Sequence, residues 1–330
     1  MKPQLGVLVA RSLSEVIDVV AARLPTRLAL LSPLQSDSAV SKMTYSEIQE
    51  TSTRVASGLM SIGVTPGSVV LSDLPNVAEN LVLQIACDRL GAAMGTAKNA
   101  KAIETYRNEK IDIRACVSTS NPLNNSEHIF GDIMSSIDSP PVIVGSKESG
   151  GDVTRFENLL ECDVSNFETN SNENDEAGDV PFAYFNSLNP LYSNQIVELG
   201  AAAAEKLSLD VEDRVCVSIT LCHAFGIGSA CTSAFVSGAT VVLPAVGGIH
   251  GCGVPSIRAE TTLDVLREQE CTWCSIAKRE NITFIIHFVS STSQLIHSIL
   301  SYIIRNITTQ MLRNTYCART QVRFYLQIST

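Results

Sequence analysis

The stretch SITLCHAFGIGSACTSAFVSGATVVLPA, residues 218–245, decides how this chain is expected to fold. Its first residues continue a β-branched run from Arg214, which ends at His223 and predicts a strand. Small residues follow from Phe225 to Gly238 at a length that favours a helix, and a second β-branched run then predicts another strand. A strand, helix and strand of these lengths are typical of two parallel strands joined by a crossover helix.

The same alternation begins near the N-terminus of the sequence. Thr44 and Glu47 form a capping box, which predicts that a helix starts there, and Gly63 is expected to end it. Gly91 is expected to end the next helix in the same way. The expected elements of this first run are helices within 12–27, 44–62, 76–91 and 99–110, and strands within 28–31, 64–74, 92–97 and 114–120.

A polar, acidic segment at 166–179 is expected to be a surface linker to a second run of the same kind. The expected elements of that run are strands at 181–187, 214–221, 239–245 and 271–276, and helices at 193–209, 225–238 and 259–270. The sequence therefore predicts an α/β protein with two runs of alternating βα units, whose mostly parallel sheets are flanked by helices.

Composition changes abruptly after Cys274. Residues 275–330 contain no glycine or proline and carry a net charge of +5, whereas the whole chain of 330 residues carries −10. We expect a domain over 1–274, with subregions of about 1–120 and 181–274, followed by an unassigned, basic, isoleucine-rich tail. The acidic balance of the chain argues against nucleic acid as a partner.

Location was considered from the cysteines and the apolar segments. The ten cysteines are spread along the chain, and no secretory leader is recognised, so we expect reduced, buried thiols in a cytoplasmic protein. Residues 282–304 lack charged side chains and are long enough to span a bilayer, but their polar residues disfavour insertion. Cys271 and Cys274 lack a second pair at zinc spacing, so no metal site is expected.

Two segments resemble the adenylate-forming superfamily of acyl-CoA synthetases, luciferases and peptide-synthetase adenylation domains. The first reads TLCHAFGIG at 220–228, followed by SGATVVLPA at 237–245. The second, at 43–94, reads MTYSEIQETSTRVASGLMSIGVTPGSVVLSDLPNVAENLVLQIACDRLGAAM. The resemblance covers about residues 12–274. It implies an incomplete N-terminal domain of that fold, without the small C-terminal domain that carries a catalytic lysine.

The resemblance implies an AMP-forming acyl-CoA synthetase that uses ATP, Mg²⁺ and coenzyme A. Its substrate would be a fatty or other apolar carboxylic acid, joined to AMP and then transferred to the thiol. His223 would lie beside the acyl-adenylate, and Ala224, Phe225 and Gly226 would wall the acyl pocket. A histidine that only caps the strand end is the alternative interpretation. No residue is assigned a catalytic role.

The segment where the family's phosphate loop is expected departs from the pattern. Residues 183–199 contain no glycine, lysine or arginine, although such a loop needs glycines for close backbone approach and a cation to neutralise charge. An ordinary loop that caps the next helix is one interpretation, and a weak nucleotide loop is the other. Glycines at 247–253 offer a substitute. The weak nucleotide-binding candidates are Ser187, Asn189, Ser193, Gly247, Gly248 and Arg258.

The missing motifs leave two functions open. One is a truncated acyl-CoA synthetase. The other is a non-catalytic relative, or pseudoenzyme, that binds an acyl group or a protein partner through the retained fold. Acyl-chain specificity and oligomeric state do not follow from the sequence.

Overall fold

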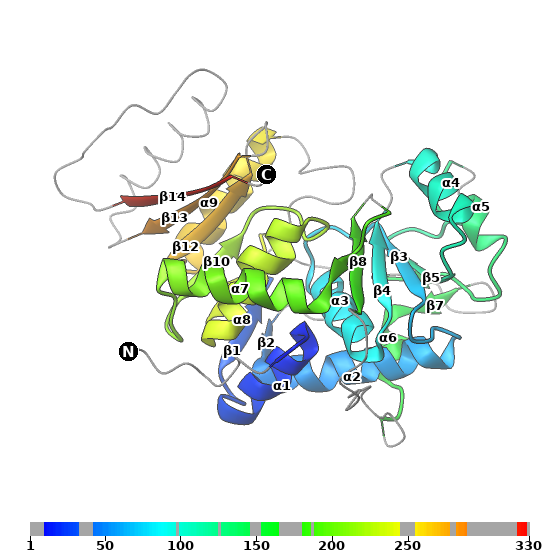
Figure 1. Ribbon diagram of the computed structural model, residues 1–330, viewed down its shortest axis with the longest axis horizontal. Coiled ribbons are helices and arrows are strands. Elements are labelled where there is room, and N and C mark those ends of the chain that lie inside the picture. Colours follow the sequence, from blue (N-terminus) through cyan, green and yellow to red (C-terminus); the bar gives the residue numbers. More distant parts are fainter. Residues whose placement is uncertain are drawn as a thin grey trace.

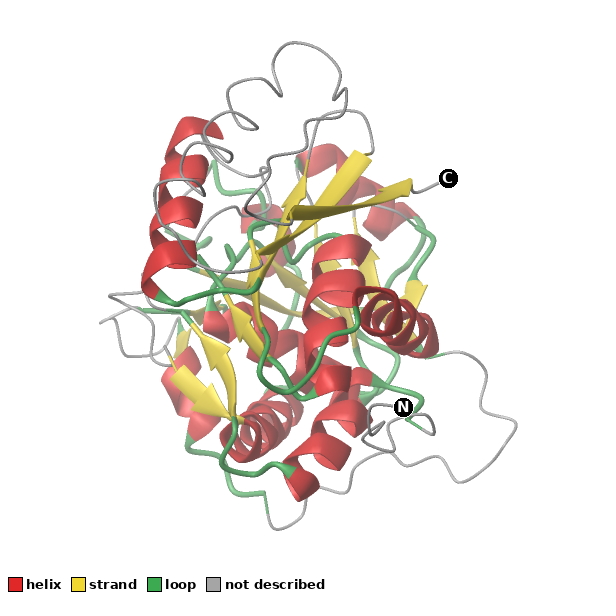
Figure 2. Cartoon of the chain, turned by 90° about the vertical axis from the view of Figure 1, so that its left-hand side faces the viewer, coloured by secondary structure: helices red, strands yellow, loops and turns green. Residues whose placement is uncertain are grey.

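The computed structural model describes residues 10–32, 42–96, 99–124, 127–145, 153–164, 180–185, 188–244, 255–277, 282–288 and 322–328. Within these residues the strands form two sheets of seven strands each. Figure 1 shows the two sheets on either side of α3 and α7, and Figure 2 shows helices on both sides of the strands. The predicted α/β architecture is confirmed.

We call the first sheet the β3 sheet after its central strand. Its order is β7 (Thr154–Arg155), β6 (Val142–Ile143), β5 (Ile113–Ser118), β3 (Val69–Ser72), β4 (Ala93–Thr96), β8 (Pro181–Phe185) and β9 (Leu191–Tyr192). All neighbours are parallel except β8 and β9. Buried apolar side chains fill the central strands, as expected for a parallel sheet covered on both faces.

The second sheet is the β10 sheet. Its order is β14 (Val322–Ile328), β13 (Ile282–Phe288), β12 (Trp273–Ala277), β10 (Arg214–Val217), β11 (Thr240–Val242), β1 (Leu28–Leu31) and β2 (Lys42–Thr44). The pairs that join β12, β10, β11 and β1 are parallel, and the outer pairs are antiparallel. The mostly parallel pairing at the centre of each sheet agrees with the predicted crossover units.

The two sheets do not follow the two runs of the sequence. Strand β1 pairs in parallel with β11, with Leu30 opposite Val241. Strand β8 pairs in parallel with β4, with Ala183 opposite Met94. Each run therefore contributes two strands to the sheet formed mainly by the other, β1 and β2 from the first run and β8 and β9 from the second. Buried residues of both sheets belong to one hydrophobic cluster.

Apart from two short helices that were not predicted, at 131–134 and 156–160, the helices begin and end close to the predicted positions. They are α1 (Leu13–Arg23), α2 (Tyr45–Ser61), α3 (Ala78–Leu90), α4 (Ala100–Asn108), α5 (Gly131–Met134), α6 (Phe156–Leu160), α7 (Ser193–Leu207), the π-helix η2 (Phe225–Thr232), α8 (Ser233–Ser237) and α9 (Pro255–Glu268). The capping box is confirmed: the Glu47 carboxylate accepts the Thr44 N–H at 2.7 Å, and the Thr44 hydroxyl accepts the Glu47 N–H at 3.3 Å. Gly91 ends α3 with φ +75°.

Helix α3 is buried on every side. All of its thirteen residues are buried, including polar side chains such as Gln84 and Asp88. A polar side chain in this position must find a hydrogen-bond partner within the protein, because burial without one costs stability. Asp88 and Gln84 of α3 and Asn76 of the turn before it bond to neighbouring elements, and some of these bonds reach the site described below.

The segment after Cys274 corrects the expectation that the pattern of strands ends there. Residues 271–276 were predicted to hold the last strand, but β13 pairs antiparallel with β12 and β14 pairs antiparallel with β13. The change at β12 is from parallel crossovers to antiparallel pairing. Residues 282–288 of the membrane candidate form β13, and 289–304 lie outside the described residues. In the described part of the chain, no helix has the length and apolarity needed to cross a membrane.

Candidate functional site

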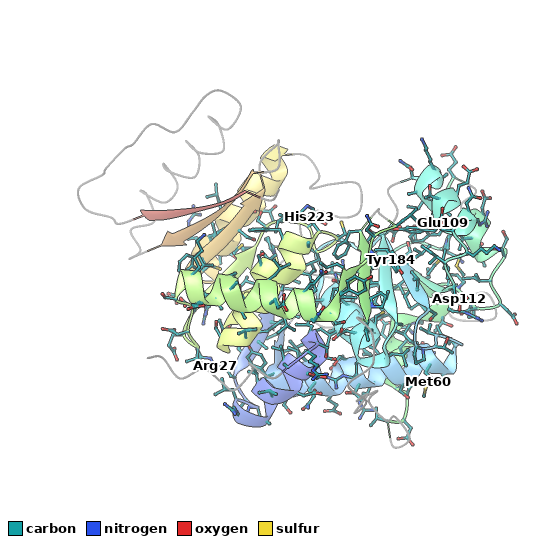
Figure 3. All side chains as sticks on the ribbon, in the orientation of Figure 1. Arg27, Met60, Glu109, Asp112, Tyr184 and His223 are labelled. Atoms are coloured by element: carbon teal, nitrogen blue, oxygen red, sulfur yellow. The ribbon has the colours of Figure 1, made fainter. Side chains whose placement is uncertain are left out.

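The predicted site residue His223 lies beyond the end of its strand. Strand β10 ends at Val217, and the π-helix begins at Phe225. Residues 218–221, which were predicted to continue the strand toward His223, are therefore not part of it, because the backbone leaves the sheet and turns before the helix. The His223 side chain is exposed, and Figure 3 labels it above α7, between the strands of the β10 sheet and Tyr184.

The His223 ring caps the π-helix. Its Nδ1 accepts the backbone N–H of Phe225 at 3.1 Å, and its carbonyl oxygen accepts the N–H of Ile227 at 3.2 Å. Helix starts leave unpaired N–H groups, and a side-chain acceptor satisfies one of them. With Nδ1 as the acceptor, the neutral ring carries its hydrogen on Nε2. His223 therefore combines a helix cap with a hydrogen-bond donor at an exposed position.

The turn around Gly226 is packed against the chain that precedes His223. A Cβ at Gly226 would lie closer than 3.0 Å to the carbonyl oxygen of Thr220, and backbone atoms cannot move aside as a side-chain tip can. Ala224 is half-buried. Phe225, expected to wall an acyl pocket, is 8% exposed and belongs to the main hydrophobic cluster.

The π-helix is buried along its whole length. The hydroxyl of Thr232 donates to the carbonyl oxygen of Ile227 at 2.8 Å. A Cβ at Gly200 of α7 would lie 2.5 Å from Thr232 Cγ2, so the two helices approach closely at that glycine. π-Helices are rare and occur frequently at functional sites, because the wider turn redirects the backbone. Here the wider turn follows His223 directly.

A buried amide holds the segment between β10 and His223. Asn76 Nδ2 donates to the carbonyl oxygens of Val217 at 3.2 Å and Ile219 at 2.6 Å. Asn76 Oδ1 accepts the N–H of Leu221 at 2.9 Å. Residues 74–76, Leu-Pro-Asn, lie within the segment that resembles adenylate-forming enzymes, but the sequence predicts no role for Asn76. A signal was present, since an asparagine just beyond the end of a buried parallel strand lies where other strand ends meet.

The weak nucleotide candidates are not brought together in the described residues. Ser193 is buried, and its hydroxyl donates to Asp88 Oδ1 at 2.5 Å. The other carboxylate oxygen of Asp88 accepts the N–H of Ser14 at 2.7 Å. Asn189 is exposed in the turn before β9. Ser187, Gly247, Gly248 and the side chain of Arg258 lie outside the described residues.

The Asp88 carboxylate is part of the fold rather than of an open site. Burial raises its pKa above the ordinary value, and the hydrogen bonds from Ser193 and Ser14 act in the opposite direction. A buried carboxyl group needs hydrogen-bond donors, and the Ser193 hydroxyl supplies one of them to Asp88.

A second polar cluster lies at the carboxyl ends of β3 and β5. The hydroxyl of Ser118 donates to Asp73 Oδ2 at 3.1 Å, and His128 Nε2 lies 3.2 Å from both side-chain oxygens. His128 Nδ1 accepts the N–H of Phe130 at 3.2 Å, so Nε2 carries the hydrogen of the neutral ring. Ser118 is fully buried. Its hydroxyl faces no basic nitrogen, so the arrangement is that of a structural network.

Metal-ligating side chains and thiols are the remaining candidate groups among the described residues. No group of three or more histidine, cysteine, aspartate or glutamate side chains there could hold a metal ion. The eight cysteines within the described ranges are free thiols, and seven of them are buried. Cys216 and Cys274 face each other on neighbouring strands, and hydrogen bonding to Cys271 and Cys274, with burial, raises the pKa of Cys216.

Comparisons with known proteins agree with the fold. Residues 17–112 match the family model described as AMP-binding enzyme, and curated protein sequences give no significant match. The apo structure of MbtA from Mycobacterium smegmatis aligns with a TM-score of 0.59 at 20% identity, over 80% of this chain and 47% of that one. A long-chain-fatty-acid-CoA ligase, FadD1, from Archaeoglobus fulgidus aligns with a TM-score of 0.58 at 18% identity, over 80% of this chain and 51% of that one. The N-terminal subdomain of NpsA from Klebsiella oxytoca, in complex with anthranilyl-AMSN, aligns with a TM-score of 0.54 at 17% identity, over 80% of this chain and 58% of that one.

This chain therefore spans about half the length of these solved structures, with shares of 47%, 51% and 58%. At such identities the likeness shows the fold, which is that of the N-terminal portion of adenylate-forming enzymes. The resemblance inferred from sequence is confirmed at that level, and residues 17–112 carry the family match.

Proposed function

We propose that this chain is the N-terminal part of an AMP-forming acyl-CoA synthetase. Its substrate would be a fatty or other apolar carboxylic acid, and ATP, Mg²⁺ and coenzyme A would be its co-reactants. The observation that carries the proposal is the His223 turn. It lies beyond the carboxyl end of the central strand of the β10 sheet, in a fold whose parallel strands bind ligands at that edge.

In the proposed reaction, a carboxylate oxygen of the acid attacks the α-phosphorus of ATP. A new C(O)–O–P bond forms, the bond to pyrophosphate breaks, and the thiol of coenzyme A later takes the acyl group and releases AMP. Charge develops on oxygen atoms in both steps, so hydrogen-bond donors aimed at those oxygens would stabilise the transition states. His223 supplies one such donor at Nε2, while Nδ1 stays bonded to Phe225.

The domain over 1–274, with subregions at about 1–120 and 181–274, remains part of this proposal, as does a cytoplasmic location. The acyl wall formed by Ala224, Phe225 and Gly226 is also proposed. For Phe225 we expect only an edge of the ring to face an acyl group, because most of the side chain is buried.

A non-catalytic relative that binds an acyl group or a protein partner is the second candidate. The segment 183–199 favours it, because it has no glycine, lysine or arginine with which to hold a polyphosphate. The bond from Ser193 to Asp88 also favours it, since it engages a hydroxyl that a nucleotide loop would need. In this candidate the His223 turn binds the carboxylate of an acid that is never activated.

One set of measurements separates the two candidates. Acid-dependent exchange of labelled pyrophosphate into ATP would be followed over a panel of short-chain, long-chain and aromatic acids. Calorimetry would measure binding of a free fatty acid, of ATP with Mg²⁺, and of an acyl-sulfamoyl adenosine. Exchange with any acid supports the synthetase, whereas fatty-acid binding without nucleotide binding or exchange supports the non-catalytic relative. Absence of all of these contradicts the synthetase and the acyl-binding relative together.

A pair of variants tests the role of His223 in that assay. His223→Asn keeps a side-chain acceptor for the helix start but removes the Nε2–H donor. His223→Ala removes both. We expect both variants to weaken binding about tenfold, the range of a hydrogen bond to a charged group, and only His223→Ala to lose stability as well. Unchanged binding in His223→Asn would contradict the proposed donor.

A further inference from the structure

Asn76 joins the two sheets at their carboxyl ends. It follows β3, whose last residue is Ser72, and its amide bonds the chain that follows β10. Its three hydrogen bonds are with the carbonyl oxygens of Val217 and Ile219 and the N–H of Leu221, at 3.2, 2.6 and 2.9 Å. We call this set of bonds the Asn76 clamp. Residues 218–221 are not paired with any strand that the structure describes, and the Asn76 clamp supplies hydrogen bonds to their backbone instead.

Only an amide of this length fits the Asn76 clamp. The side chain is 1% exposed, so its polar atoms have no access to bulk water. Two backbone carbonyls require a donor and one backbone N–H requires an acceptor, and the asparagine amide provides both on adjacent atoms. Aspartate would keep the acceptor and lose the donor. Gln84 adds a weaker bond to the same segment, from Nε2 to the carbonyl oxygen of Leu221 at 3.3 Å.

The clamped segment is in direct contact with the turn that carries His223. The Thr220 carbonyl oxygen lies against Gly226 so closely that no side chain fits between them. Thr220 lies between two residues that Asn76 holds, Ile219 and Leu221. A shift of residues 219–221 would therefore move the start of the π-helix, and with it the Phe225 N–H to which the His223 ring is bonded.

We propose that Asn76 is a positioning residue: through residues 217–221 it fixes the start of the π-helix and so holds the His223 ring with its Nδ1 on the Phe225 N–H. Its importance for ligand binding rests on the proposed function, but its effect on the ring does not. Asn76, in the turn after β3, thus determines the orientation of the His223 side chain, in the turn after β10. Packed backbone transmits this effect, because close contacts leave no room for small independent shifts.

The test follows the hydrogen on the His223 ring in the full chain without any ligand. Histidine-selective ¹⁵N labelling of the five histidines gives the ratio of Nε2–H to Nδ1–H for each ring by NMR. His223→Asn and His128→Asn assign the two signals. His128 is an internal reference, because its Nδ1 accepts the N–H two residues later in the same way as His223 does.

In Asn76→Ala, we expect the Nε2–H to Nδ1–H ratio of His223 to fall about fivefold, the factor that one hydrogen bond contributes. The ratio for His128 should not change. Tyr106→Phe is the matched control, because it also removes a buried side chain's bonds to two backbone carbonyls, those of Thr96 and Tyr184. It should leave His223 unchanged, even if it destabilises the protein to a similar extent.

An Asn76→Ala variant that folds and keeps the His223 ratio of the parent protein would overturn the proposal. If that variant does not fold, Asn76→Asp carries the test, because it keeps the acceptor for Leu221 and replaces the two donated bonds by at most one, from a protonated carboxyl. A change in His223 equal to the change in His128 would also overturn it, since it would indicate general loosening. Failure of the chain to bind an acid or nucleotide would refute the proposed function and leave this result intact.

Discussion

Replacing Gly226 by alanine adds one methyl group against backbone atoms. The new Cβ would lie closer than 3.0 Å to the Thr220 carbonyl oxygen and 3.0 Å from its carbon, so the turn must move. Overpacking of this kind costs about 1–3 kcal/mol. Alanine in a helix gains about 0.5–1 kcal/mol over glycine, which offsets part of that cost. We therefore expect Gly226→Ala to lower the free energy of unfolding by about 1.5 kcal/mol.

Gly228→Ala is the control within the same π-helix. Its Cβ would meet Leu199 Cδ1 at 3.2 Å, the tip of a flexible side chain that can move by a few tenths of an ångström. We expect a stability within about 0.5 kcal/mol of the parent protein. In urea, with a slope of about 3 kcal/mol per molar, Gly226→Ala should lower the midpoint by about 0.5 M. Equal midpoints for the two variants would refute the argument that the Thr220 backbone limits this turn.

Three further predictions concern stability. Burial raises the pKa of Asp88, so the free energy of unfolding of the parent protein should fall as pH rises from about 4 through the folded-state pKa. Asp88→Asn should remove this pH dependence. Urea titrations that give the parent protein and Asp88→Asn the same pH dependence of stability would contradict the prediction. Thr44→Ala should lower the free energy of unfolding by about 1 kcal/mol through loss of the α2 cap, with unchanged stability as the opposing result. Asp18→Ala should cost about 3–5 kcal/mol, because it leaves the Arg89 guanidinium, whose side chain is 3% exposed, without its bonds at 2.7 and 2.8 Å. Arg89→Met should cost less in the same melts, since the Asp18 side chain is 34% exposed.

Local signals in the sequence predicted individual elements well. The capping box placed the start of α2, Gly91 placed the end of α3, and alternating helices and strands indicated parallel sheets. Each of these signals depends on residues that are close in the sequence, so it can be recognised without knowing how the rest of the chain folds. The resemblance to adenylate-forming enzymes also came from such ordered elements.

The candidate site was less predictable. The β-branched run predicted a strand as far as Leu221, next to His223, yet β10 ends at Val217 because the Asn76 clamp replaces sheet pairing beyond it. Ser193 read as a helix cap or a phosphate contact, and the structure bonds its hydroxyl to Asp88 on another helix. Composition alone does not report such long-range partners.

The sequence by itself therefore determined the α/β class, the order and ends of most helices, and the position of a glycine-containing turn after His223. Only the tertiary structure decided that β1 and β2 join the β10 sheet and that β8 and β9 join the β3 sheet. It also decided that β13 and β14 extend the β10 sheet and that Asn76 holds the turn of His223. The reason is physical. Helix caps and breaks depend on hydrogen bonds between near neighbours in the chain, whereas strand order and buried polar pairs depend on which distant segments meet in the core.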